Sequence, residues 1–357
     1  MPSGTSLPVA QIAEGIEKVR SEIKKTIVGQ DEMIELMIVG LLSKGHVLLE
    51  GVPGIAKTLT SKLFAKSIQT GYSRIQFTPD LMPADVLGTS VFMSGEFEFK
   101  KGPIFSNIIL IDEINRAPAK TQSAMFEVME ERQITIDGVQ HDLEAPFMVL
   151  ATQNPIEQEG TYALPEAQLE RQITMDGHTY PMAEPFMVLA TQNPIDSEGT
   201  YRLPEAQMDR FLFKIQLDLP NLEEEIMILK NRGSETQSEP TVTPAISGED
   251  LIRFQEWTSA IRMEEKLLHY IATIVVKTRN HPSLYAGASP RASLAIFRAS
   301  QTFAVIDGRD FVIPEDIKRA AIPAMRHRII LNPEKEMEGI SPDLILEGII
   351  QSIEIPR

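Results

Sequence analysis

The segment that most constrains the fold is HVLLEGVPGIAKTLTSKLFAKSI at residues 46–68, an apolar run followed by a glycine-containing turn and an amphipathic pattern. This order predicts a buried strand, a loop and a helix. The loop follows the phosphate-loop pattern G-x-x-x-x-G-K-[ST], with Ala56 in place of the last glycine. Backbone amides and a helix N-terminus bind phosphate oxygens in such loops. We therefore expect a nucleotide-binding loop made of Gly51, Val52, Pro53, Gly54, Ile55, Ala56, Lys57 and Thr58.

Two side chains of this loop and two carboxylates further on complete the expected chemistry. Lys57 would place a positive charge beside the outer phosphates, and the Thr58 hydroxyl can ligate Mg²⁺. The stretch NIILIDEINRA at residues 107–117 is typical of a buried parallel strand, whose carboxyl end is where open α/β sheets bind ligands. At that end we expect Asp112 to hold Mg²⁺ through water and Glu113 to orient and deprotonate the attacking water. A helix cap would explain either carboxylate alone, but not both beside a phosphate loop.

Composition limits the class of protein. A length of 357 residues predicts two domains, and 43% hydrophobic residues are ordinary for a globular chain. The absence of cysteine excludes disulfides and thiolate metal sites and fits a reducing compartment, so we expect a cytoplasmic location. We expect neither a secretory signal nor a membrane span, because no window is sufficiently apolar. The formal net charge of -16 argues against nucleic acid as the main partner.

Further stretches extend the two motifs over nearly the whole chain. They are IVGQDEMI (27–34), FTPDLMPADVLG (77–88), KGPIFSNIILIDEINRAPAKTQSAMFEVMEERQIT (101–135), ATQNP, GTYRLPEAQMDRF (199–211), GASPRASL (287–294) and MRHRIIL (325–331). Together with the phosphate loop they resemble the MoxR family of AAA+ ATPases, which also has alanine at the position of Ala56. The resemblance implies an α/β fold, with a five-stranded parallel sheet, a helix-2 insert, a hairpin before sensor 1 and an all-α lid domain.

The resemblance also implies roles for residues outside the phosphate loop. Val28, Gly29 and Gln30 would border the adenine of ATP, and the asparagine of ATQNP would be sensor 1, which polarises the attacking water. Arg210 would be the arginine finger that is offered to a neighbouring subunit's ATP, and Arg291 would be sensor 2, reaching from the lid. On spacing alone, Arg291 could equally be a surface charge at a helix start. A finger that acts in trans requires head-to-tail contacts in a closed ring, which in this family is a hexamer.

The pattern of apolar and turn residues suggests how the chain is divided. We expect an ATPase core over residues 1–220, a linker over 221–249 and a helical lid with a C-terminal helix over 250–357. The linker is suggested by the polar stretch NRGSETQSEPTVTPAISGED. His327, between two arginines, is expected to belong to a cation cluster at a helix C-terminus. The expected core strands are 46–50, 72–77, 107–112, one FMVLAT run and 211–217, with hairpins at Asp137-Gly138 and Asp176-Gly177.

One block of the chain occurs twice in tandem. Residues 131–169 and 170–208 differ at twelve of 39 positions, so 39 − 12 = 27 are identical. A parallel sheet has one place for the FMVLAT strand, so one block must lie outside the core. We expect the second block to occupy the sheet, because opening the chain at the hairpin of the first block disturbs less. Sensor 1 would then be Asn193, and Asn154 and Arg171 would be spare copies.

Three functions are compatible with these features. The first is a Mg²⁺-dependent ATP hydrolase whose ring remodels a partner protein; the resemblance implies chaperone-like work, often with a partner that contains a von Willebrand A domain. The second is a nucleotide-binding module in which the duplication has impaired hydrolysis. The third is a nucleic-acid motor or a chelatase-type motor subunit, which the net charge and the few basic residues of the hairpins disfavour. The residues do not identify the client protein or the ring size.

Overall fold

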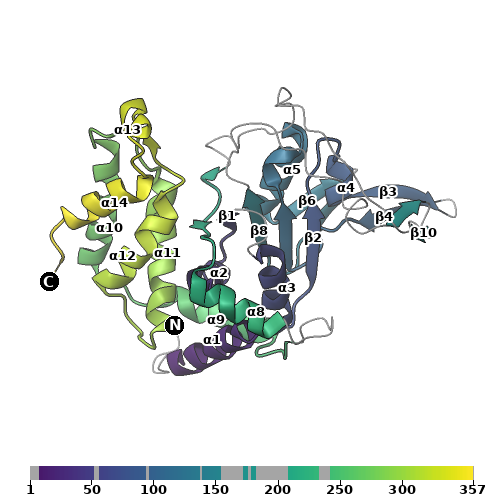
Figure 1. The fold of residues 1–357 in the computed structure, drawn as a ribbon, viewed down its shortest axis with the longest axis horizontal. Coiled ribbons are helices and arrows are strands. Elements are labelled where there is room, and N and C mark those ends of the chain that lie inside the picture. The colour runs from purple at the N-terminus through teal and green to yellow at the C-terminus, as the bar shows by residue number, and fades with distance from the viewer. Residues whose placement is uncertain are drawn as a thin grey trace.

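Two lobes make up the structure, a sheet flanked by helices and a lobe built mainly of helices (Figure 1). The structure is a computed structural model. It describes residues 8–51, 56–93, 96–136, 139–153, 172–175, 178–181, 208–232 and 242–356. Among these residues, no helix has the length and apolar character that a membrane-spanning segment needs.

The central sheet has five parallel strands in the order β11-β1-β8-β5-β2. This confirms the predicted α/β class and the predicted five strands, which are β1 (Val47–Glu50), β2 (Tyr72–Gln76), β5 (Ile108–Asp112), β8 (Met148–Gln153) and β11 (Phe213–Gln216). Because all five run in the same direction, the residues that follow β1 and β5 lie at one edge of the sheet, and the residues that precede β1 and β11 lie at the opposite edge. We call these the carboxyl edge and the amino edge.

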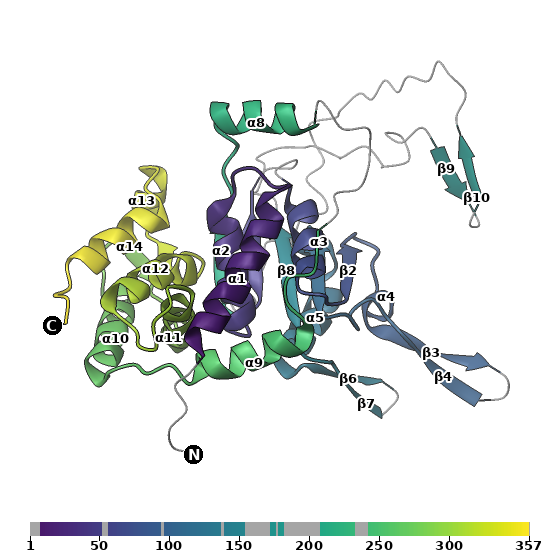
Figure 2. The same ribbon diagram turned by 90° about the horizontal axis from the view of Figure 1, so that it is seen from below.

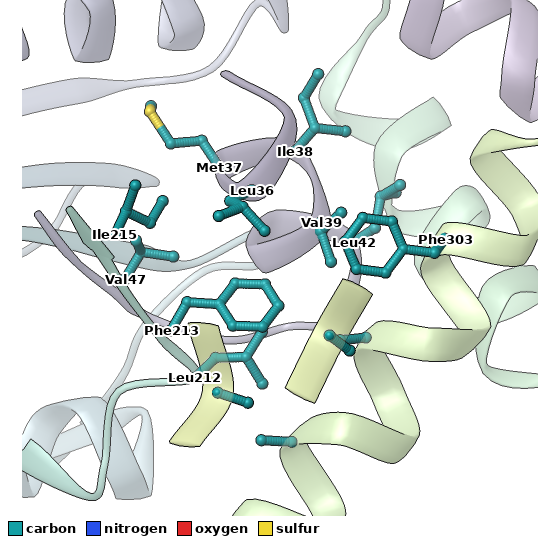
Figure 3. Close-up of a cluster of buried hydrophobic side chains, with 14 of the residues drawn as sticks. Leu36, Met37, Ile38, Val39, Leu42, Val47, Leu212, Phe213, Ile215 and Phe303 are labelled. Carbon is teal, nitrogen blue, oxygen red and sulfur yellow. The ribbon is translucent and has the colours of Figure 1, made fainter. Parts of the chain in front are cut away.

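Alternate residues of each strand face two different cores, as the period of two in a strand requires. Val47 and Leu49 of β1 pack with the helices on one face, whereas Leu48 packs with those on the other. On the first face, helices of both lobes pack against the sheet. Leu36 and Met37 of α2 (Asp31–Leu42) lie over Phe213, and Phe303 of the lid approaches the same cluster (Figure 3). The core on this face is therefore shared by the two lobes.

The helices around the sheet bury the faces on which apolar residues recur at helical spacing. The helix α1 (Val9–Lys24) has a buried apolar stripe at helical spacing, formed by Ile12, Ile16, Val19 and Ile23. It packs on α3 (Lys57–Ser67) and α11 (Pro290–Ile306). The remaining elements of this lobe are α2 (Asp31–Leu42), α3 (Lys57–Ser67), α4 (Pro83–Leu87), η1 (Ile114–Arg116) and α5 (Ala119–Glu131), with the antiparallel hairpins β3–β4 (Gly88–Met93, Glu96–Lys101) and β6–β7 (Gln133–Ile136, Val139–Asp142). The strands predicted on either side of Asp137-Gly138 are confirmed.

The helical lobe agrees with the lid that the sequence predicts. Its elements are α9 (Gly248–Ser259), α10 (Glu265–Arg279), α11 (Pro290–Ile306), α12 (Pro314–Met325), α13 (Pro333–Met337) and α14 (Pro342–Gln351), with the short antiparallel pair β12 (Leu284–Ala286) and β13 (Ile330–Leu331). Within the segment 221–249, for which the sequence suggests a linker, α8 (Leu222–Arg232) is a helix (Figure 2). A first turn with three glutamates at the helix N-terminus favours this helix.

The strand between β1 and β5 comes from the first block, so the expectation that the second block occupies the sheet is wrong. Positions that differ between the blocks give a physical reason. His141 packs on Phe99 of β4, with ring centroids 4.2 Å apart, and lies edge-on to Phe105; the second block has Tyr180 at this position. Chain continuity gives a second reason. Arg132 has the same identity as Arg171 of the second block, but it is the C-cap of α5, donates to the Lys44 carbonyl oxygen at 2.9 Å and is followed directly by β6. These contacts favour the block that follows α5 without interruption.

The second block retains the hairpin. Strands β9 (Gln172–Met175) and β10 (His178–Pro181) pair antiparallel, with Gln172 opposite Pro181, as Gln133 lies opposite Asp142 in the first block. This confirms the strands predicted around Asp176-Gly177. Figure 2 shows β9 and β10 well apart from the sheet and from the β6–β7 hairpin. Asn154, Arg171 and Asn193 lie outside the described residues.

Candidate active site

The phosphate loop lies at the carboxyl edge of the sheet, between β1 and α3. Ala56 has a left-handed backbone (φ 59°) and precedes the first helical residue, Lys57. The Lys57 Nζ donates to the Gly51 carbonyl oxygen at 2.7 Å, so its side chain folds back toward the residue that follows β1. Among the described residues, no side chain caps the first turn of α3, which leaves its amides available to an anion. Val52, Pro53, Gly54 and Ile55 lie outside the described residues.

Asp112 ends β5 at the same edge and is held by two neighbouring strands. Its Oδ2 accepts from Arg74 Nε of β2 at 2.6 Å, and its Oδ1 accepts from the Thr152 hydroxyl of β8 at 3.3 Å. The residue is 8% exposed, so the carboxylate is partly withdrawn from water. Burial raises the pKa of the nearby Tyr72 phenol to about 12, and the Asp112 charge acts in the same direction. Asp112 is therefore a buried carboxylate that side chains of β2 and β8 hold in place.

Glu113 follows Asp112 in a left-handed conformation (φ 56°), which turns its side chain away from the strand direction. Its backbone amide donates to Thr152 Oγ1 at 2.9 Å. Its Oε2 accepts from Gln76 Nε2 at 2.9 Å and from Arg116 Nη1 at 2.6 Å. Backbone and side chain are thus both held, by residues of β8, β2 and η1.

The two carboxylates act electrostatically on Lys57. Burial lowers the pKa of the Lys57 amine, while the charges of Asp112 and Glu113 oppose this and favour the protonated form. The structure therefore brings together a lysine, two carboxylates and a helix N-terminus that the sequence separates by more than 50 positions. This arrangement can bind phosphate oxygens, and it holds one carboxylate in a position suited to accept a proton.

The residues expected at the adenine lie beside the start of α8. Gly29 and Gln30 both have left-handed backbones (φ 69° and 60°). The Gln30 amide donates to the Asp218 carbonyl oxygen at 3.2 Å. A Cβ on Gly29 would lie 2.9 Å from the Glu224 carboxylate, so any larger residue would have to displace this side chain and adopt a left-handed backbone, which glycine adopts readily.

Arg210 and Arg291 lie at the amino edge, on the opposite side of the sheet from Lys57. The C-terminal end of α5 reaches this edge, because the Met129 carbonyl oxygen lies 3.0 Å from Nε2 of His46, which directly precedes β1. The neighbouring Glu130 pairs with Arg210 through Oε2 and with Arg291 through Oε1, the latter at 2.8 Å. Both expected arginines therefore meet at one carboxylate, far from the phosphate loop of their own chain.

Sequence reasoning missed several residues of this arrangement. Arg74, Gln76 and Thr152 contact the two carboxylates from neighbouring strands, and Glu130 joins the two arginines. The signal available for the first three is their position: each lies near the carboxyl end of a strand next to β5. His327 lies just after α12 among the expected cations, since Arg326, Arg328 and Lys214 act on it electrostatically. Its ring is buried, with Nε2 3.1 Å from the Phe211 carbonyl oxygen, and burial together with these charges holds its pKa well below the ordinary value, which disfavours its charged form.

Comparison with known proteins agrees with this geometry. The model of the ATPase family associated with various cellular activities (AAA) matches residues 46–173 and 169–213, and the model of the AAA lid domain matches residues 276–349. A putative ATPase from Cytophaga hutchinsonii has a similar solved structure, with a TM-score of 0.81 and 38% identity over 98% of this chain and 97% of that one. Fold, loop and lid define an AAA+ ATPase.

Curated relatives narrow the class to one family. The chain is 40% identical to Chaperone MoxR1 of Mycobacterium tuberculosis, over all of this chain and 86% of the relative. It is 41% identical to the uncharacterized protein YeaC of Bacillus subtilis, over 95% and 94%, and 27% identical to Protein MoxR of Methylorubrum extorquens, over 94% and 93%. The chain belongs to the MoxR family of AAA+ ATPases.

Proposed function

We propose that the protein hydrolyses ATP with Mg²⁺ in a ring of identical subunits and uses this reaction to remodel partner proteins or complexes. The observation that carries the proposal is the junction of Lys57, Asp112 and Glu113 at the carboxyl edge. The amides at the start of α3 and the Lys57 amine would bind the outer phosphates. Glu113, held by Gln76 and Arg116, would accept the proton of the attacking water.

The donors at this edge fit a magnesium ion. Mg²⁺ prefers hard oxygen ligands and keeps part of its water shell. Thr58 is the second residue of α3, so its hydroxyl could ligate the ion directly. The Asp112 carboxylate already accepts from Arg74 and Thr152, so Asp112 would act on the ion through water. When bound, the ion would neutralise charge that develops on the phosphates.

The position of β8 changes the proposed sensor 1. Asn154 directly follows β8, whereas Asn193 belongs to the block outside the sheet. We therefore assign the polarisation of the attacking water to Asn154, in place of the expected Asn193. The assignment at the base is unchanged: we propose that the adenine of ATP is bordered by Val28, Gly29 and Gln30.

The amino-edge arginines support action between subunits. Arg210 and Arg291 meet at Glu130, on the opposite side of the sheet from Lys57, so neither faces the phosphate loop of its own chain. A head-to-tail contact would bring this edge to a neighbour's carboxyl edge, and repetition of that contact closes a ring, for which we propose six subunits. Arg210 would then be the finger, and Arg291 would act at the same neighbouring site.

The proposed partner is a protein. A relative with 40% identity is named a chaperone, and the net charge of -16 disfavours a polyanion as partner. From the family resemblance we propose a client that contains a von Willebrand A domain. We also propose that the protein acts in the cytoplasm. The chain itself does not specify the client.

Phosphate release tests the reaction. The parent chain should release phosphate from ATP only with Mg²⁺, and Glu113→Gln should lower the rate at least about a hundredfold while nucleotide binding is retained. Glu127→Gln, an exposed carboxylate on α5, is the matched control and should keep the parent rate. Nucleotide binding without turnover in the parent would contradict hydrolysis.

The impaired-hydrolysis alternative is tested by removing the second block. Since β8 of the first block makes the contacts to Asp112 and Glu113, residues 170–208 are the block to delete. If turnover appears only after this deletion, the parent is the impaired module. If both chains turn over ATP at similar rates, the alternative fails.

A further inference from the structure

A partly buried joint, formed by Asp209, Ser289 and Arg328, connects the lid to the segment that carries Arg210. Asp209 directly precedes Arg210, and its carboxylate accepts the Ser289 hydroxyl at 2.9 Å and Arg328 Nε at 2.7 Å. Ser289 caps α11, two residues before Arg291. The Asp209 carboxylate thus links the chain segment next to Arg210 with the start of the helix that carries Arg291.

Arg328 makes several hydrogen bonds to this segment. It belongs to the MRHRIIL motif, to which the proposed reaction gives no role. Its side chain is 3% exposed. Beyond Asp209 Oδ1, it donates to the carbonyl oxygens of Asp209 at 2.8 Å, Phe211 at 2.6 Å and Leu212 at 3.2 Å, and to that of Ala324 on α12. A buried guanidinium is tolerated only when its donors are satisfied. Here they are satisfied by the backbone on both sides of Arg210.

The joint lies beside Arg210 and Arg291, so a displacement of the joint would move both guanidinium groups. Arg210 and Arg291 are 81 positions apart in the sequence (291 − 210), yet each pairs with one oxygen of Glu130. The Arg210 Nη1 also donates to the Phe126 carbonyl oxygen at 3.0 Å. Glu130 and these arginines are partly exposed, so their own pairs stabilise the geometry weakly. The better-held part of the arrangement is the contact of Asp209 with Ser289 and with Arg328, whose side chain is buried.

We infer that Asp209 and Arg328 are positioning residues, which fix Arg210 and Arg291 as one unit at the site of a neighbouring subunit. This inference rests on the proposed function. A lid that rotated without the joint would carry Arg291 away from Arg210. With the joint, both guanidiniums move together, because Asp209 is bonded to Arg210 and accepts from the cap of the helix that holds Arg291.

Subunit mixing tests the inference. Asp209→Asn keeps the shape of the side chain but removes its charge, and it leaves the phosphate loop intact. The turnover number should fall about a hundredfold, the effect of a misplaced catalytic group, while ATP affinity stays unchanged. Mixed in equal amounts with Lys57→Ala, it should recover about a quarter of the parent rate, because a quarter of randomly formed sites combine an intact loop with an intact arginine pair.

Matched variants separate positioning from general destabilisation. Arg328→Lys should lower turnover and be rescued by Lys57→Ala in the same way. Arg326→Lys changes a buried arginine of the same motif, which pairs with Asp343 at 2.8 Å, and should leave turnover unchanged. Ser289→Ala removes the hydroxyl that donates to Asp209 and caps α11, but it keeps the pair of Asp209 with Arg328. This variant serves if Asp209→Asn does not fold, and it should lower turnover several-fold.

The outcomes are distinct. If Asp209→Asn keeps the parent rate, the positioning role is wrong. If it is slow and Lys57→Ala does not rescue it, while Lys57→Ala does rescue Arg210→Ala, the joint only stabilises the fold and the inference is again overturned. A parent chain without turnover would remove the proposed function and this role together, whereas the first two results leave the proposed function intact.

Discussion

Thr152 Oγ1 lies 2.9 Å from the backbone nitrogen of Glu113, so the strand next to β5 fixes the turn that presents this carboxylate. The same hydroxyl donates to Asp112 Oδ1 at 3.3 Å. Thr152 is 2% exposed, which makes these two hydrogen bonds sensitive to its removal. The relationship also shows that the first block of the duplication provides the strand beside Asp112 and Glu113.

Thr152→Val should lower ATP turnover about tenfold, because the buried amide of Glu113 loses its acceptor, at a cost of about 1–2 kcal/mol. Thr191 is the corresponding residue of the second block, 39 positions later, and Thr191→Val should leave turnover unchanged. Steady-state phosphate release on both variants decides the matter. Equal effects, or a larger effect at Thr191, would show that the second block forms the site.

Asn154→Ala should lower turnover about a hundredfold, since a lost polar group at the attacking water removes transition-state stabilisation. Asn193→Ala should have no effect, because β8 leads into Asn154. Single-turnover kinetics separate this loss from any change in ATP binding. A loss confined to Asn193→Ala would restore the original assignment of sensor 1.

Deletion of residues 170–208 should stabilise the protein. The connection from β8 to β11 spans 212 − 153 = 59 residues, and the deletion leaves 59 − 39 = 20. Shortening it lowers the entropy cost of closing the loop by about 1 kcal/mol. Urea denaturation of both chains measures this difference. A deleted chain that fails to fold would show that the second block is part of the core.

The free energy of unfolding should fall as the pH is lowered from 6.5 toward 4. His46 is buried, its Nδ1 accepts from the Val149 amide at 2.9 Å, and burial lowers its pKa to about 4. Between these pH values the unfolded chain binds a proton that the folded chain does not, so stability is lost as pH falls, by about 3 kcal/mol at pH 4.

Denaturant titrations at several pH values measure this effect. His46→Gln should be less stable at pH 7 but show a shallower pH dependence than the parent. His269→Gln, at an exposed position, should retain the slope of the parent. Parallel slopes for the parent and His46→Gln would contradict the assigned protonation state.

Much of the fold follows from the sequence because local patterns and tertiary structure agree there. The apolar run ending in Asp112 is a buried parallel strand, and Ser289-Pro290 begins α11 with a side-chain cap and a proline in the first turn, as such pairs do. The two hairpins also follow from their alternating residues and Asp-Gly turns. Short-range chemistry determines all of these elements.

The remainder depends on contacts between distant residues. The run FMVLATQNPI is identical in both blocks, so its own sequence cannot decide which copy enters the sheet. The difference lies in contacts such as that of His141 with Phe99. Likewise, Arg74 reaches Asp112 only because β2 pairs with β5 in the observed register, and Glu130 joins two arginines from different lobes.

The central claim is that the loop around Lys57 binds a triphosphate, and a calorimetric titration with ATP in magnesium buffer tests it most directly. The account predicts saturable binding to the parent chain. Affinity should be at least about tenfold weaker for Lys57→Ala, which lacks a charge-assisted hydrogen bond, and unchanged for Lys66→Ala, an exposed lysine of the same helix. Absence of binding heat in the parent, or equal affinity of the parent and Lys57→Ala, would contradict the account.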